Sequence, residues 1–120
     1  MAFCRWRILK ITDEHGLSLF KLFQAFSLGM NDWWLNSGIV KVEETPESYV
    51  VYGVSGSEYE VAKTDEGDSP ALEGFLVEAQ RGFVQTGMDG AMIEISNIAE
   101  YRESKKHETY SSRRHPRPSQ

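Results

Sequence analysis

The sequence predicts an α+β fold with a mostly antiparallel sheet, two helices and a flexible C-terminal tail. Residues 39–63 alternate apolar and polar side chains, which is typical of half-buried strands. Residues 17–30 and 70–87 carry apolar side chains at the three- and four-residue spacing of helices. With 120 residues the chain fits one domain. We expect a single domain over 1–101 in the order β-α-βββ-α-β, followed by a basic flexible tail over 102–120.

The first predicted strand is FCRWRILKI, residues 3–11. Its apolar residues begin on one face at period two, with Cys4, Trp6 and Ile8. The apolar side switches at Leu9 and Ile11, which indicates either a bulge or a strand end covered on both faces.

The next segment, GLSLFKLFQAFSLGM, has apolar residues around more than half of a helix surface. We expect a helix here, either sandwiched in the core or with an apolar side left for a partner. Gly29 would end or kink it. A second short helical turn, DWWLNS, would then be closed by Gly38 in the left-handed conformation.

A three-stranded meander is expected from IVKVEE, YVVYGV and EYEVAK, joined by short turns at TPES and SGS. Apolar side chains would face the core, with Glu43, Glu58 and Glu60 facing outward.

The clearest helix start is Ser69 followed by Pro70, a side-chain cap and a proline at the first helical position. An apolar stripe at helical spacing follows, formed by Leu72, Phe75, Leu76, Ala79 and Phe83. Val84 would extend it. Gly87 would end this helix. Residues 91–98 then predict a final strand; a short helix running into IAEYRESKK is the second interpretation.

The charge is distributed unevenly. Residues 1–101 carry seven basic and sixteen acidic side chains, a balance of −9, whereas residues 102–120 carry six basic and two acidic ones, a balance of +4. An acidic body repels nucleic-acid phosphates, so we do not expect direct nucleic-acid binding. The tail has too few apolar residues to offset the entropy lost on ordering.

The side chains do not form a recognisable catalytic or metal-binding constellation. Cys4 is the only cysteine, and His15, His107 and His115 are scattered. The sequence has neither a signal peptide nor an apolar run of membrane-spanning length. We therefore expect a cytoplasmic, non-enzymatic protein that needs no cofactor or metal.

Two adjacent tryptophans, Trp33 and Trp34, raise the question of binding. Neighbouring side chains point in different directions on a helix and to opposite faces on a strand, so one core does not easily hold both. Either each covers a different edge of the core, or one of them anchors a partner. Met30 and Leu35 would extend that patch. An acidic hairpin surface, formed by Glu43, Glu44, Glu47, Glu58 and Glu60, is the second candidate site.

These features favour a small protein-binding domain, of the inhibitor, immunity or adaptor type, whose partner is another protein or a second copy. The first alternative is an acidic inhibitor that imitates nucleic-acid phosphates and binds a nucleic-acid-binding protein. The second alternative is an enzyme or small-ligand carrier with a pocket between the aromatic helix and the sheet.

Overall fold

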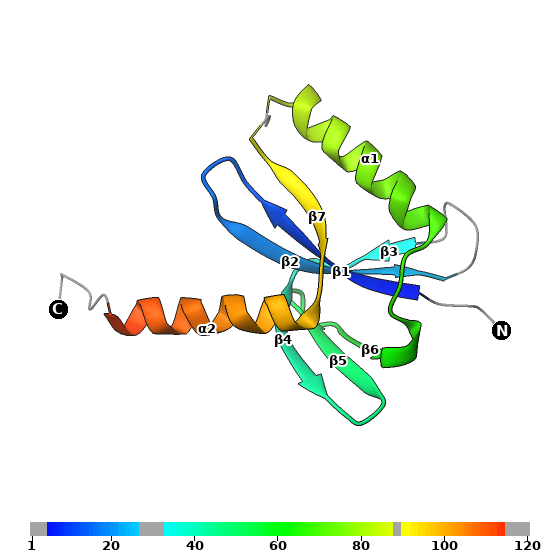
Figure 1. The fold of residues 1–120 in the computed structure, drawn as a ribbon, viewed down its shortest axis with the longest axis vertical. Coiled ribbons are helices and arrows are strands. Elements are labelled where there is room, and N and C mark those ends of the chain that lie inside the picture. Colours follow the sequence, from blue (N-terminus) through cyan, green and yellow to red (C-terminus); the bar gives the residue numbers. More distant parts are fainter. Residues whose placement is uncertain (1–4, 27–32, 88–89, 115–120) are drawn as a thin grey trace.

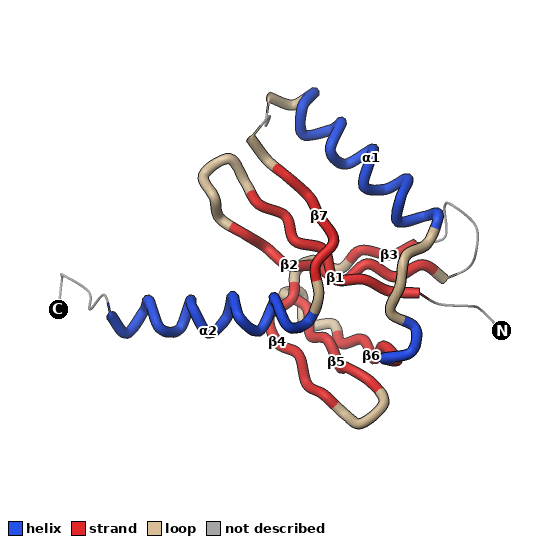
Figure 2. Tube along the Cα trace, viewed as in Figure 1, coloured by secondary structure: helices blue, strands red, loops and turns tan. Residues whose placement is uncertain are grey.

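The molecule consists of three layers and one projecting helix (Figure 1). The computed structural model describes residues 5–26, 33–87 and 90–114, with residues 107–114 as backbone only. A three-stranded sheet and a four-stranded sheet form two layers, and helix α1 (Pro70–Gln85) covers the far side of the larger sheet. Helix α2 (Ile98–Arg114) leaves this body and points away from it (Figure 2). The predicted α+β class with antiparallel sheets is confirmed.

The larger sheet has the strand order β3-β2-β1-β7 and is antiparallel throughout. Its strands are β1 (Arg5–Thr12), β2 (Ser18–Ala25), β3 (Trp33–Leu35) and β7 (Met92–Ser96). The register of β1 against β2 is unbroken from Arg5 to Thr12, so this strand has no bulge. Leu9 is nevertheless fully buried, because β1 is covered on both faces, as the second sequence interpretation proposed.

The helix predicted over residues 17–30 is wrong, because its described part forms strand β2. Phe20 and Leu22 face the smaller sheet, while Phe23 and Ala25 face α1. A strand buried on both faces is apolar at odd and even positions alike. Over eight residues such a run resembles a helix with a wide apolar surface. The predicted order of elements is therefore wrong at two places: strands β2 and β3 stand where a helix was expected before the meander, and a helix, α2, follows β7.

The smaller sheet is the predicted meander, with β4 (Ile39–Glu44), β5 (Ser48–Gly53) and β6 (Glu58–Ala62) in that order. A short 3-10 turn, η1 (Lys63–Asp65), follows. Gly38 precedes the meander with a φ of 142°, so its positive φ is as expected although no helix comes before it.

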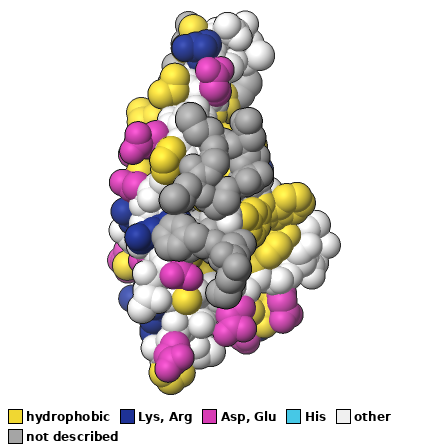
Figure 3. All heavy atoms as spheres, turned by 90° about the vertical axis from the view of Figure 1, so that its right-hand side faces the viewer, with side chains coloured by type: hydrophobic (Ala, Val, Ile, Leu, Met, Phe, Trp, Pro, Cys, Tyr) yellow, Lys and Arg dark blue, Asp and Glu magenta, His cyan; other side chains and the backbone are white. Residues whose placement is uncertain are grey.

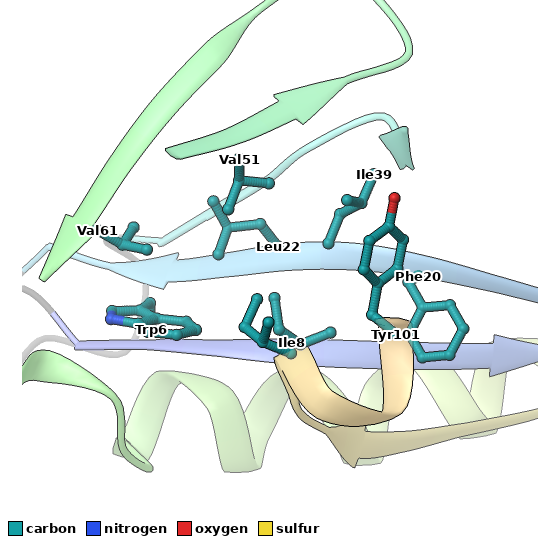
Figure 4. Packing of buried hydrophobic residues seen from close by; sticks show 9 residues of the cluster. Trp6, Ile8, Phe20, Leu22, Ile39, Val51, Val61 and Tyr101 are labelled. Carbon is teal, nitrogen blue, oxygen red and sulfur yellow. The ribbon is translucent and has the colours of Figure 1, made fainter. Parts of the chain in front are cut away.

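The main core lies between the two sheets (Figure 4). It consists of Trp6, Ile8, Phe20, Leu22, Ile39, Val51, Val61, Ile98 and Tyr101. The fully buried indole of Trp6 donates from Nε1 to the carbonyl oxygen of Ala62 at 2.7 Å. This bond links the first strand of one sheet to the last strand of the other.

Helix α1 forms the second core against the opposite face of the larger sheet. The Ser69 hydroxyl accepts a hydrogen bond from the Leu72 amide at 3.2 Å, which confirms the predicted cap. The predicted stripe packs there, with Leu72 buried and Phe75, Leu76, Ala79 and Phe83 partly buried. Val84 does not extend the stripe, because its side chain is 55% exposed and is not part of the second core.

Strand β7 leads directly into α2. The region therefore contains both the strand of the first interpretation and the helix of the second. Ile98 and Tyr101 anchor the first turn of α2 in the main core. The Glu100 carboxylate accepts from Lys10 and Ser96, which ties the same turn to the sheet. The helical backbone continues to Arg114 through most of the segment predicted as a tail, and residues 115–120 lie outside the described residues.

Candidate partner-binding surfaces

Trp33 and Trp34 lie on opposite faces of β3, a strand at the edge of the larger sheet. The second helical turn predicted for this segment is therefore wrong. Residues 33–35 pair with β2 instead, in the register of Phe23 with Leu35 and Ala25 with Trp33. Because strand neighbours alternate between faces, one indole lies on the α1 side and the other on the side of the smaller sheet.

The Trp33 indole belongs to an aromatic group on the α1 side. It stacks on Phe23 with ring centroids 5.6 Å apart and an interplanar angle of 18°. It also contacts Phe75 of α1 at a centroid distance of 5.0 Å. The side chain remains 39% exposed, so it covers one rim of the second core and is still accessible from outside.

The Trp34 indole reaches the smaller sheet and is 47% exposed. Its Nε1–H donates to the hydroxyl oxygen of Tyr59 on β6 at 3.1 Å. This bond satisfies the polar atom of the side chain and restricts the ring to one orientation. The exposed part of Trp34 is therefore mostly the carbon surface of a ring whose orientation is fixed.

The other predicted members of the aromatic patch behave differently. Leu35 is partly buried against the second core and supports the strand from inside. Met30 lies outside the described residues. The structure adds Tyr59 of β6, whose contact with Trp34 the sequence did not predict. Figure 3 shows hydrophobic side chains exposed beside the undescribed residues on one side of the molecule.

The second surface is the outer face of the smaller sheet, where three predicted residues meet. One cross-strand row runs from Glu43 through Val50 to Glu60, and the next from Lys41 through Tyr52 to Glu58. All three glutamates are exposed. The Tyr52 hydroxyl donates to Glu43 at 2.8 Å, and Lys41 forms an ion pair with Glu43 at 3.1 Å.

These two contacts lower the pKa of Glu43, because both stabilise its carboxylate; the Tyr52 hydrogen bond is the larger cause. Glu58 and Glu60 have no such contact among the described residues. The outer face therefore presents two uncompensated carboxylates beside a third that is partly neutralised.

The remaining predicted acidic residues are not part of this outer face. Glu44 lies in the row of Tyr49 and Val61, on the opposite side of the sheet. It forms ion pairs with Lys63 and Arg102, and the hydrogen bonds from these two cations lower its pKa. Glu47 is exposed in the turn between β4 and β5. Glu44 thus joins the end of β4 to Lys63 and to α2.

Two further findings concern the described part of the chain. Its His, Cys, Asp and Glu side chains form no group of three or more that could hold a metal ion. None of its helices has the length and apolar character required to cross a bilayer.

The chain matches no protein-family model, no curated protein and no solved structure. The candidate surfaces rest on their own geometry.

Proposed function

We propose that this protein is a non-enzymatic binding domain that associates with other proteins through the edge that carries Trp33 and Trp34. The observation that carries the proposal is that Trp34 is both exposed and hydrogen-bonded. Nearly half of this side chain is exposed, yet its indole N–H already has a partner in Tyr59. Large apolar side chains held in this way are typical of binding anchors.

Two physical effects favour Trp34 as an anchor. A partner that covers Trp34 removes apolar ring surface from water without leaving the indole N–H unsatisfied. The ring also loses little rotamer freedom, because the hydrogen bond already holds it. Truncation of such an anchor typically costs about 2 kcal/mol or more of binding free energy.

The test is capture of partners by the tagged protein in its native cells, followed by affinity measurement with the purified partner. Trp34→Ala should weaken binding by more than about tenfold, as expected for a hot-spot residue. Val84→Ala is the matched control, because Val84 is a comparably exposed apolar side chain on α1. Added salt should change the affinity little, because apolar burial is not screened. Equal binding by Trp34→Ala and the parent would refute the aromatic edge as the site.

A second candidate function, imitation of nucleic-acid phosphates, is favoured by the position of Glu43, Glu58 and Glu60 on one sheet face. In that case Glu58→Lys with Glu60→Lys should abolish binding, and affinity should fall steeply with salt. Glu14→Lys with Glu73→Lys, two exposed positions away from this face, is the control for the same change in net charge. Binding that resists both charge reversal and salt would exclude this function.

A further inference from the structure

We propose that the outer edge of β3 joins two copies of this chain, strand to strand, into a two-fold dimer. This inference rests on the proposed function, because it specifies what covers the aromatic edge. It follows from three observations: the direction of the backbone groups of β3, the partial capping of the opposite sheet edge, and the symmetry of the resulting register.

The backbone groups of Trp33 and Leu35 point away from β2. The Asn36 amide donates to the Leu22 carbonyl oxygen at 3.0 Å, so this opposed pair is a hydrogen-bonded one. Hydrogen-bonded and non-hydrogen-bonded pairs alternate along an antiparallel ladder. The backbone N–H and C=O groups of Trp34 therefore point toward β2, and those of Trp33 and Leu35 point away from it. Within the described chain, no backbone or side-chain group bonds to their outward N–H and C=O groups.

The opposite edge of the same sheet is capped at one end by a side chain. Gln80 of α1 donates from Nε2 to the Ala91 carbonyl oxygen at 3.0 Å and accepts from the Ile93 amide at 3.3 Å. Its amide group thus takes the place of a neighbouring strand beside Ala91 and Ile93, at the start of β7. Proteins protect sheet edges in this way against unwanted pairing. For β3 the described residues provide no equivalent.

The short strand is complementary to itself. In an antiparallel pair of β3 strands centred on Trp34, Trp33 exchanges both backbone bonds with Leu35 of the second copy, and Leu35 does the same with its Trp33. The contact is isologous and closed, as in most homodimers.

Both tryptophans gain contacts in this register. The two Trp34 side chains lie directly opposite each other on one face of the joined sheet, where cross-strand aromatic pairs are stabilising. Trp33 lies opposite the second copy's Leu35 on the other face. The exposure of both indoles is thereby explained by one interface. Glu43, Glu58 and Glu60 stay on the outer face of the smaller sheet, where a further partner can reach them.

The first experiment is analytical ultracentrifugation of the full chain at several concentrations. We expect a concentration-dependent dimer. Trp33→Pro removes an outward N–H that does not bond to β2, and proline is tolerated at such edge positions. Trp33→Ala is the matched control, because it removes the ring and keeps the N–H. The proline variant should raise the dimer dissociation constant by at least tenfold more than the alanine variant does. Thermal unfolding of both variants checks that they are folded.

The second experiment tests the register and does not depend on the proline variant. With Cys4 replaced by serine, Trp34→Cys places two thiols at directly opposed positions, where Cα atoms are about 4.5 Å apart. That separation permits a disulfide. We expect mild oxidation to cross-link Trp34→Cys to a covalent dimer, and Trp33→Cys and Val84→Cys to remain mostly monomeric.

The outcomes separate this inference from the proposed function. A monomer at all concentrations, or cross-linking at position 33 as efficient as at 34, overturns the strand-paired dimer. If such a monomer still binds a captured partner through Trp34, the proposed function stands without the dimer. A register-specific dimer supports the inference even where capture identifies no other protein, and in that case the second copy is the partner.

Discussion

Arg102 of α2 donates a hydrogen bond to Glu44 at the end of β4, with Nη1 3.1 Å from Oε1. Lys63, just after β6, reaches the same carboxylate. The two cations also lie over the ring of Tyr49, at 5.8 and 5.2 Å from its centroid respectively. One exposed carboxylate thus links the projecting helix to both ends of the smaller sheet.

Acid should weaken the attachment of α2. The pKa values of Glu44 and Glu100 are lowered, the first mainly by the hydrogen bond from Lys63 and the second mainly by that from Ser96. A carboxylate with a lowered folded-state pKa stabilises the fold above its unfolded pKa, and this contribution disappears as pH falls through the folded value. The thermal midpoint should therefore drop as pH falls below about 4.5. Glu44→Gln with Glu100→Gln should flatten that drop, whereas Glu14→Gln should not. An unchanged acid slope in the double variant would contradict this assignment.

Trp6→Phe should destabilise the protein by about 1 to 3 kcal/mol, because it leaves the partly buried carbonyl oxygen of Ala62 without its donor. Chemical denaturation measures this difference. Trp6→Ala should cost more, about 3 to 5 kcal/mol, since it also creates a cavity. Equal stability of Trp6→Phe and the parent would mean that this bond contributes nothing net.

Asn36→Ala should cost about 1 to 3 kcal/mol as well. The Asn36 side chain is buried, and its Oδ1 accepts from the Leu22 amide at 2.8 Å, so it continues the ladder where β3 ends. Ser37→Ala is the control, because Ser37 accepts a single exposed backbone bond from Ser55. The predicted order of stability is parent, Ser37→Ala, then Asn36→Ala; the reverse order of the two variants would argue against this role of Asn36.

Truncation after Lys106 should leave the thermal midpoint nearly unchanged. Among the described side chains, those of α2 that pack on or bond to the body include Ile98, Glu100, Tyr101 and Arg102, all in its first turns. Tyr101→Ala is the informative comparison, because it removes a ring that packs on Phe20 at 5.6 Å and should lower stability by several kcal/mol. A drop of several degrees on truncation would indicate that the basic segment contacts the body.

The sequence predicts best those elements that have one buried face. The alternation in β4 to β6 and the capped stripe of α1 follow directly from local spacing. Strand β2 does not, because both of its faces are covered and its pattern loses the period of two. Helix α2 is not predicted beyond Lys106 even by the second interpretation, because the sequence after Tyr101 is almost entirely polar and no apolar periodicity marks a helix there.

The candidate site was predictable only in part. Adjacent tryptophans must point in different directions, which holds on the observed strand as well. The contact between Trp34 and Tyr59 joins residues 25 positions apart and depends on how the two sheets stack. The grouping of Glu43, Glu58 and Glu60 follows from hairpin register, whereas the ion pairs of Glu44 depend on where α2 begins.

Gln80 also restricts where a further chain can pair with the larger sheet. A unit with two open sheet edges can add neighbours at both ends and, like a bifunctional monomer in a linear polymer, grows into a fibre. One glutamine amide occupies the Ala91 and Ile93 end of the β7 edge, so strand addition at that edge of the larger sheet would first have to displace it. Loss of the amide would leave both edges of the larger sheet open to pairing and would favour open-ended growth over a dimer.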